Sequence, residues 1–323
     1  MAPAVSIILP VFNRLRFLRA TIDSVLAQSF ADWELLIADD GSATETRAYL
    51  RTLDDARRIK VLWLPHRANP AAARNAALSE ARGEFVAFLD SDDLWLPHKL
   101  QVQVGALRAD AAPAWSYTGF TLIDESGSPL SGARAAKAPG GAAPLLARLV
   151  KEQALVVTPS VVVRRDLIER VGGFNEELLV CEDYELWMRL ASHGEAEAID
   201  EPLVRVRRHR EHSFDDITCL ENLRRALEIV QDSHTAPHLQ AVLRRRRAGI
   251  SANIARGHAR GRRRLRVFAT LLQSAPYSWQ YRDWWLGGAA AMARASAPRI
   301  ALDVIRKYRA GTRSPTAPHA PPR

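Results

Sequence analysis

Short, nearly unbroken apolar runs alternate with helical patterns in the N-terminal part of the chain. Val5 to Val11 is one such run, and Trp33 to Ala38 and Glu84 to Leu89 are others. Between them, apolar residues recur at the spacing of one helix face, as from Leu15 to Leu26. Strands that are apolar throughout are typical of parallel sheets buried on both faces. The alternation therefore predicts an α/β fold, with a mostly parallel, Rossmann-like sheet flanked by helices.

Two groups of carboxylates follow predicted strands directly. Asp39 and Asp40 end one strand, and Asp90-Ser91-Asp92-Asp93 ends another. Ligands of such sheets bind outside the carboxyl ends of the strands, so both groups are expected at one edge. Clustered carboxylates repel one another unless a cation offsets their charge, and Mg²⁺ and Mn²⁺ prefer oxygen ligands. The sequence therefore predicts a metal-assisted site that holds a diphosphate.

Local patterns predict where several elements begin and end. Ser42 with Glu45 forms a capping-box pattern, which predicts a helix that starts at Ser42. Asn69 before Pro70 predicts another helix, with the asparagine side chain as its cap. The stretch from Gly132 to Pro144 is rich in Ala, Gly and Pro and predicts a loop. Leu203 to Arg208 predicts the last strand.

The charge balance points to an anionic partner. The net charge is +9 and the pI is about 10.0, which suits a nucleotide, a nucleic acid or an anionic lipid surface. Two cysteines, Cys181 and Cys219, provide neither a disulfide framework nor a zinc cluster, and they fit a reducing compartment. No secretory pattern opens the chain, and the longest apolar run, Trp284 to Ala293, is too short to span a bilayer. We therefore expect a cytoplasmic protein, with peripheral contact to the inner face of the cell membrane.

Three stretches together resemble one enzyme family. The first consists of Val5 to Asn13 together with Asp39-Asp40-Gly41-Ser42. The second consists of Ala73-Arg74-Asn75, Gly83-Glu84-Phe85 and the acidic DXD motif in Phe88 to Asp93. The third consists of Gly172-Gly173-Phe174 and Glu182 to Trp187. In this order and spacing, the first 213 residues or so resemble a family 2 glycosyltransferase with the GT-A fold. The resemblance implies transfer of a sugar from a nucleotide-diphosphate sugar, UDP-sugar by default, to an acceptor hydroxyl with inversion.

The resemblance also implies roles for individual residues. Asp183 matches the family's catalytic base, with the adjacent Glu182 as the alternative. Asp93 and Asp92 match the residues that contact the metal, Mg²⁺ or Mn²⁺, with Asp93 as the direct ligand and Asp92 on the metal or the donor ribose. His209 could touch the metal or a phosphate. The corresponding structural alternatives are a solvated turn for the acidic cluster, a favourable helix-dipole contact for either carboxylate at 182 and 183, and a basic surface loop around His209.

A further set is expected to bind the donor nucleotide: Pro10, Phe12, Asn13, Asp40, Arg74, Asp92 and Arg208. Asp40 matches the family position that accepts a hydrogen bond from the nucleobase, whereas Asp39 is expected to be structural. Arg74 fits a place near the base or the phosphates, or a surface place on an alanine-rich helix. Trp95 and Trp187 could stack on a sugar, and Trp187 fits the core better.

The C-terminal part has another composition. We expect a GT-A catalytic domain over residues 1–214, a helical basic region over 215–311 and a disordered Pro-rich tail over 312–323. The basic region contains tryptophans and an apolar stripe from Ile300 to Tyr308. It is either a solvated helical appendage or an amphipathic surface that sits on anionic lipid.

The resemblance further implies a non-processive enzyme, because the Gln-x-x-Arg-Trp motif that accompanies polymer synthesis in this family is absent. The expected acceptor is a glycan, a glycolipid or a lipid-linked sugar in cell-surface polysaccharide or glycolipid synthesis. One rival is a metal-dependent nucleotidyltransferase, but Phe12-Asn13-Arg14-Leu15 stands where a Gly-rich phosphate loop would be needed. The other is a nucleic-acid-binding protein; no recognised motif supports it, and no nucleic acid is expected as a partner.

Overall fold

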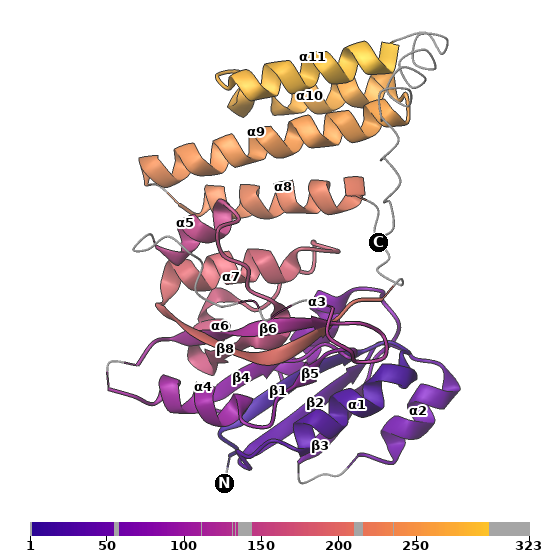
Figure 1. Ribbon diagram of the computed structural model, residues 1–323, viewed down its shortest axis with the longest axis vertical. Helices are drawn as coiled ribbons and strands as arrows, with labels where there is room; N and C mark the ends of the chain where they lie inside the picture. Colours follow the sequence, from indigo (N-terminus) through magenta and orange to yellow (C-terminus); the bar gives the residue numbers. More distant parts are fainter. Residues whose placement is uncertain are drawn as a thin grey trace, which may run out of the picture. The chain divides into compact units, whose positions relative to one another are not determined.

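The computed structural model describes residues 2–54, 58–110, 112–130, 132, 134, 144–209, 216–234 and 236–296 (Figure 1). Contacts divide the chain into two compact units, Met1–Arg246 and Arg247–Arg323. The predicted boundary at residue 214, the stripe from Ile300 to Tyr308 and the tail over 312–323 lie outside the described residues. No helix in the described ranges is long and apolar enough to cross a membrane.

The strands are β1 (Val5–Val11), β2 (Trp33–Asp39), β3 (Ile59–Trp63), β4 (Phe85–Phe88), β5 (Leu94–Trp95), β6 (Trp115–Ile123), β7 (Val161–Arg164) and β8 (Ala196–Arg207). The helices of the first unit are α1 (Leu15–Leu26), α2 (Thr44–Arg51), α3 (Pro70–Leu78), α4 (Lys99–Leu107), α5 (Leu145–Val150), the short 3-10 helix η1 (Thr158–Ser160), α6 (Arg165–Val171), α7 (Glu182–His193) and α8 (Asp216–Asp232). Helix α9 (Pro237–Arg260) runs from the first unit into the second, which also contains α10 (Arg264–Ser278) and α11 (Arg282–Ser296).

In the described residues the strands form one mixed sheet of eight, in the order β3-β2-β1-β4-β7-β6-β8-β5. Strands β3, β2, β1 and β4 are parallel neighbours, and so are β6 and β8. Strand β7 is antiparallel to β4 and β6, and β5 is antiparallel to β8. The predicted α/β class with helices on the sheet is confirmed. The antiparallel strands were not predicted, because the apolar pattern of a strand does not encode its direction.

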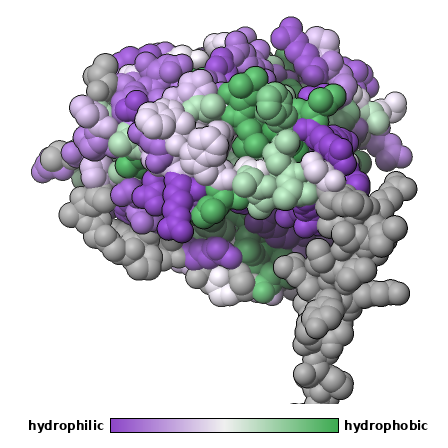
Figure 2. Space-filling model, turned by 90° about the horizontal axis from the view of Figure 1, so that it is seen from above, coloured by the Kyte–Doolittle hydropathy of each residue, from purple (hydrophilic) through white to green (hydrophobic). Residues whose placement is uncertain are grey.

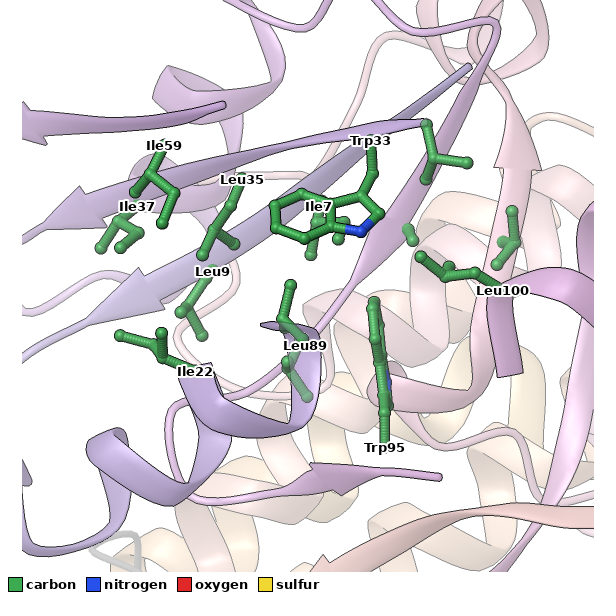
Figure 3. Packing of buried hydrophobic residues seen from close by; sticks show 14 of the residues in the cluster. Ile7, Leu9, Ile22, Trp33, Leu35, Ile37, Ile59, Leu89, Trp95 and Leu100 are labelled. Carbon is green, nitrogen blue, oxygen red and sulfur yellow. The ribbon is translucent and has the colours of Figure 1, made fainter. Parts of the chain in front are cut away.

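Helices cover both faces of the sheet (Figure 1). One face packs on α1, α2 and α4, and Figure 3 shows its centre, where Ile7, Leu9 and Leu35 meet Ile22, Trp95 and Leu100. The other face meets α3, α6 and α7. There Trp187 is fully buried against Phe88, with ring centroids 5.8 Å apart. Burial on both faces explains why β1 and β2 are apolar almost throughout.

Some local predictions are confirmed and others are wrong. Asn69 caps α3, since its side chain accepts a hydrogen bond from the backbone N–H of Ala72. The capping box at Ser42 is wrong: α2 begins at Thr44, and the Ser42 hydroxyl accepts instead from the backbone N–H of Asn13, at 2.8 Å. The strand predicted from Leu203 belongs to β8, which starts earlier because β6 supplies a long parallel partner. Most of the predicted loop from Gly132 to Pro144 lies outside the described residues.

The second unit is held by small side chains between its helices. Ala255 and Ala259 of α9 pack with Val267 of α10 and with Ala291 and Ala295 of α11. Small residues let helix backbones approach closely, so this unit has a thin interior.

Candidate active site

The acidic loop after β4 is fastened to the end of β8. The Asp93 carboxylate is buried, and its Oδ1 accepts a hydrogen bond from the backbone N–H of Arg207 at 2.7 Å. The Arg207 side chain donates back to the carbonyl of Asp92, at 2.8 Å, and to the carbonyls of Asp124 and Glu125. Burial, with Asp92 and Asp90 nearby, raises the pKa of Asp93 well above its ordinary value. These contacts fix the path of the acidic loop before any ligand arrives.

Asp92 has different neighbours. Its Oδ2 lies 2.7 Å from Nε2 of His209, and Arg14 contacts the same carboxylate oxygen. Arg14 reaches it from the left-handed region, with φ of 57°, at the N-cap of α1. The acidic loop, the start of α1 and the residues after β8 therefore meet at Asp92.

Asp92 and His209 are suited to share a divalent cation. In the described ranges no three His, Cys, Asp or Glu side chains are grouped closely enough to hold a metal by themselves. One carboxylate and one imidazole fit a cation whose remaining ligands are diphosphate oxygens and water, as is usual for Mg²⁺ and Mn²⁺ beside phosphates. An open pocket of about 680 Å³ lies beside this pair, lined by Asp124, Glu125, Ser126, Leu130, Arg208 and His209. The exposed Arg208 thus lies where its guanidinium could contact a diphosphate.

Arg74 joins the acidic loop to the start of α7. Its guanidinium donates to Asp90 Oδ1 at 2.7 Å and to Glu182 Oε1 at 2.6 Å. The Arg74 side chain is almost fully buried, and it also lies over the Phe174 ring. Burial by itself would lower the pKa of Arg74, but Asp90 and Glu182 raise it above the ordinary value. The surface place that the sequence left open for Arg74 is therefore wrong.

Glu182 and Asp183 are clearly different in the structure. Glu182 is buried and bonded to Arg74, and burial raises its pKa although Arg74 opposes this. Asp183 is half-exposed; its Oδ2 accepts from the Thr158 hydroxyl at 2.8 Å and its Oδ1 from the Tyr184 backbone N–H at 2.6 Å. Two fixed hydrogen bonds orient a carboxylate that solvent can reach, which is the arrangement a general base needs.

The other acidic group, at the end of β2, organises a loop. The backbone N–H groups of Arg67 and Ala68 donate to the two oxygens of Asp40 at 2.8 and 3.0 Å. Asp39 is fully buried and pairs with Arg47 at 3.4 Å, in keeping with the structural role expected of it. Oδ2 of Asp40 also lies 3.1 Å from Nδ1 of His66, whereas Oδ1 retains a further lone pair that can accept a hydrogen bond from a nucleobase.

An exposed aromatic surface lies beside Asp40. The Phe12 ring stacks on the His66 ring with centroids 4.1 Å apart, and Phe12 is 43% exposed. Asn13 closes the turn, because its Oδ1 accepts from the backbone N–H of Ala43 at 2.7 Å. Gly41 has φ of 76°, and a Cβ there would come within 2.8 Å of His66 Cβ, so this turn needs glycine.

Both tryptophans that the sequence offered as sugar-stacking residues are buried. Trp187 is core, as expected. Trp95 is buried as well, and its Nε1 donates to the Pro159 carbonyl at 2.8 Å, so neither ring is available to a sugar.

Sequence reasoning missed several residues that shape the site. Arg14, His66, Thr158 and Arg207 all contact predicted site residues. Side chains alternate along a strand, so Arg207 would be expected on the same face of β8 as the exposed Arg205. The structure shows instead that Arg207 is buried. Asn75 belongs to one of the motifs that resemble the family, but the sequence indicates no role for it. It bonds the backbone N–H and carbonyl of Phe174, at 2.9 Å each, and so ties α3 to the turn before α7.

Comparisons with known proteins agree with this architecture. Residues 6–125 match the family model described as Glycosyl transferase family 2. The chain is 41% identical over 129 residues to a protein of Bacillus subtilis (strain 168) named as a teichuronic acid biosynthesis glycosyltransferase, TuaG, which covers 40% of this chain and 51% of that protein. It is 40% identical over 122 residues to UDP-Glc:alpha-D-GlcNAc-diphosphoundecaprenol beta-1,3-glucosyltransferase WfgD of Escherichia coli, which covers 38% of this chain and 47% of that protein. The chain thus spans about half the length of these curated relatives.

Solved structures share the fold over nearly the whole chain. S. aureus TarS 1-349 has a TM-score of 0.67 at 17% identity, over 97% of this chain and 92% of that one. Its complex with UDP-GlcNAc has a TM-score of 0.65 at 17% identity, over 96% and 92%. The mannosyltransferase PcManGT from Pyrobaculum calidifontis, in complex with GDP-Man and Mn²⁺, has a TM-score of 0.55 at 17% identity, over 98% and 82%. The likeness confirms the GT-A fold expected from the sequence.

Proposed function

Because residues 6–125 match the family model described as Glycosyl transferase family 2, we propose that the chain transfers a sugar from a nucleotide-diphosphate sugar to an acceptor hydroxyl, with inversion. One observation carries the proposal. Arg74 bridges Asp90 and Glu182, so the acidic loop and the carboxylates that open α7 belong to one site. A donor held at the loop would therefore face a base held on α7.

The donor side is assigned from contacts. Pro10, Phe12, Asn13 and Asp40 surround the turn at the carboxyl ends of β1 and β2, and we assign the nucleoside to them. Asp92 and His209 would hold Mg²⁺ or Mn²⁺, which would offset the charge that grows on the leaving diphosphate. Arg208 faces the same pocket and would pair with the diphosphate. Asp93, expected from the sequence as the direct metal ligand, is instead proposed to shape the loop, because its carboxylate accepts from the Arg207 backbone. Arg74, expected near the nucleobase or the phosphates, is proposed to act through Asp90 and Glu182.

The acceptor side is assigned to Asp183. As the acceptor oxygen attacks the anomeric carbon, the bond from that carbon to the diphosphate breaks, and Asp183 takes the hydroxyl proton. Thr158 and the Tyr184 backbone hold the carboxylate in place for this step. Glu182 is a poorer candidate because Arg74 already occupies it.

We propose a UDP-sugar as the default donor. WfgD is named for a UDP-Glc donor, and TarS binds UDP and UDP-GlcNAc. The acceptor proposed is a glycan or a lipid-linked sugar in cell-surface polysaccharide or glycolipid synthesis, since WfgD is named for a diphosphoundecaprenol acceptor and TuaG for teichuronic acid. We also propose one or a few additions per acceptor, and contact with an anionic membrane surface.

A donor-hydrolysis screen tests the donor and the cation. Nucleotide sugars that contain uridine, guanosine or thymidine are incubated with wild type and with Asp92→Asn, with and without Mn²⁺. We expect hydrolysis of one donor class, dependent on Mn²⁺ and at least about 100-fold slower in Asp92→Asn. Asp166→Asn, an exposed aspartate of α6 paired with Arg170, is the matched control and should keep the wild-type rate. Hydrolysis that ignores both Mn²⁺ and Asp92→Asn would reject the donor site.

A second experiment tests the base. Asp183→Asn keeps the shape of the side chain but cannot take a proton. We expect the rate of turnover to fall by about 10²–10⁴-fold, while UDP affinity measured by calorimetry stays near wild type. If Asp183→Asn turns over like wild type and Glu182→Gln does not, the base is Glu182.

A further inference from the structure

Helix α10 has its polar side chains inside and its large apolar side chains outside. Thr270, Ser274 and Ser278 are buried in the second unit. Leu265, Phe268 and Leu272 are exposed by 86, 56 and 63%. A helix on the surface of a globular protein normally has the opposite arrangement, so this helix leaves a large apolar stripe uncovered in the described part of the chain.

Contacts inside the unit fix α10 in this orientation. The Thr270 and Ser274 hydroxyls donate to the carbonyls one turn earlier, at 2.8 Å each, and Trp284 Nε1 donates to the Ser274 hydroxyl at 2.9 Å. Val267 is fully buried among alanines of the neighbouring helices. The two hydroxyl bonds lie within α10 and would survive its rotation. Turning the helix to hide its leucines would, however, break the Trp284–Ser274 bond and expose Val267, so the apolar stripe belongs to the folded state.

The stripe continues onto α11. Trp279 follows α10 at the spacing of the same helix face and is 64% exposed, and Trp285 and Leu286 of α11 are 58 and 57% exposed. The Trp285 Nε1 donates to the Trp279 carbonyl at 2.7 Å, which places these two positions side by side. We define the α10–α11 apolar face as Leu265, Phe268, Leu272, Trp279, Trp285 and Leu286. Figure 2 shows apolar side chains gathered in a patch among hydrophilic ones on this side of the molecule.

The surroundings of this face are strongly basic. Residues 247–296 contain nine arginines and a single acidic residue, Asp283. Arg263 and Arg266 are exposed on either side of Leu265, and Arg282 is exposed on the same helix face as Trp285. A second copy of the same face would bring like charges together, and a nucleic acid would gain little from three exposed leucines. A partner for both the apolar side chains and the arginines needs an apolar interior and an anionic outer layer. A phospholipid bilayer with anionic headgroups has this structure.

We propose that the α10–α11 apolar face docks on anionic phospholipid membranes. Its leucines and Phe268 enter the boundary between headgroups and acyl chains, the tryptophans lie at the interface, and the flanking arginines pair with headgroup phosphates. The proposal deepens the membrane contact proposed above by naming the face that makes it. It does not depend on sugar transfer, because membrane docking requires neither donor nor acceptor.

Vesicle sedimentation with the full-length chain tests the proposal. Vesicles are made from phosphatidylcholine alone or from equal parts of phosphatidylcholine and phosphatidylglycerol. We expect binding to the anionic vesicles, with at least about tenfold weaker partitioning into the neutral ones. The triple variant Leu265→Ser/Phe268→Ser/Leu272→Ser should lose at least about tenfold in partitioning into the anionic vesicles.

A matched control distinguishes docking by this face from nonspecific adsorption through any exposed leucine. Leu26, Leu155 and Leu179 are exposed leucines of the first unit, and their triple serine variant should bind vesicles like wild type. Tryptophan emission should shift to the blue when anionic vesicles are added, and Trp279→Phe/Trp285→Phe should remove most of that shift.

Several outcomes would overturn the proposal. One is equal binding by the α10 triple variant and the control variant. Another is vesicle binding that salt abolishes but that the α10 triple variant retains in full. That result would mean that binding is purely electrostatic and does not use the apolar side chains. A fall in melting temperature of the α10 variant without any vesicle binding by wild type means that the chain itself covers this face. A change from dimer to monomer in light scattering would instead identify an interface between two copies.

Discussion

Replacing Arg74 by methionine should destabilise the first unit strongly. The substitution keeps the unbranched apolar stem of the side chain but removes the guanidinium, and with it the charge, between Asp90 and Glu182. Both carboxylates then lie close together with no cation. Removing one partner of a buried ion pair costs about 3–5 kcal/mol, because the remaining charge keeps its desolvation penalty.

The structure narrows this range. The Glu182 side chain is 8% exposed, so its charge would be left almost without solvent, whereas Asp90 is 29% exposed and is partly screened. We therefore expect a loss near the lower end, about 3 kcal/mol, in the free energy of unfolding at neutral pH. Arg74→Lys should lose less, because an ammonium keeps the charge but cannot reach both carboxylates in a fork.

The loss should depend on pH with a defined sign. The pKa values of Asp90 and Glu182 are already raised by burial, and losing Arg74 removes the contact that opposes this. A carboxyl group with a raised folded-state pKa adds stability when it is protonated and loses that contribution as the pH rises. The difference between Arg74→Met and wild type should therefore shrink as the pH is lowered from neutral towards the raised pKa values.

Urea unfolding followed by tryptophan fluorescence measures these differences. Arg108→Met is the matched control, since Arg108 and Glu84 form a pair whose side chains are about half exposed, and it should cost about 0–1 kcal/mol. If Arg74→Met is destabilised no more than Arg108→Met, or if its loss grows as the pH falls, the bridging role given to Arg74 is wrong.

Three other predictions concern single side chains. Burial, with Asp183 nearby, raises the pKa of Cys181 to about 12, so in Cys219→Ser its alkylation by iodoacetamide should keep accelerating beyond pH 10; a plateau near pH 9 would contradict this. Burial lowers the pKa of Lys99 well below its ordinary value of 10.5, and its Nζ lies over the Trp95 ring with no hydrogen-bond partner among the residues that the structure describes. Because the unfolded chain binds the extra proton, Lys99→Met should have the higher melting temperature at neutral pH, with an advantage that fades as the pH approaches 10.5. A Cβ on Gly83 would meet the backbone at the start of β1 at 2.5 Å, so Gly83→Ala should cost about 1–3 kcal/mol in urea unfolding, and a neutral result would show that the backbone can give way.

Patterns close together in the sequence predicted much of the fold. Continuous apolar runs located β1 and β2, and the Asn69-Pro70 pair located the start of α3. Ser42 shows the limit of such patterns: the local signal for a cap was present, but the Asn13 backbone competes for the same hydroxyl. A local rule fails where a partner distant in the sequence offers a better contact.

The site shows the same division. The residue types of Asp92 and Asp183 and their place after a strand and at a helix start could be recognised directly. Arg207, Thr158 and Arg14 could not, because each acts through a partner that only the folded chain brings near. The proposal of Asp183 rather than Glu182 as the base depends on a contact between distant residues, because Arg74 bonds Glu182.

The bond between Asp93 and Arg207 also has a consequence for the order of synthesis. The two residues are 114 positions apart, so the acidic loop leaves the ribosome long before the strand that covers it. Until Arg207 emerges, Asp93 stays hydrated and ionised, and the loop carries its full negative charge. His209, the other side chain at Asp92, emerges later still. If Asp92 and His209 hold the diphosphate as proposed, a nascent chain contains both of them only after β8 has been made.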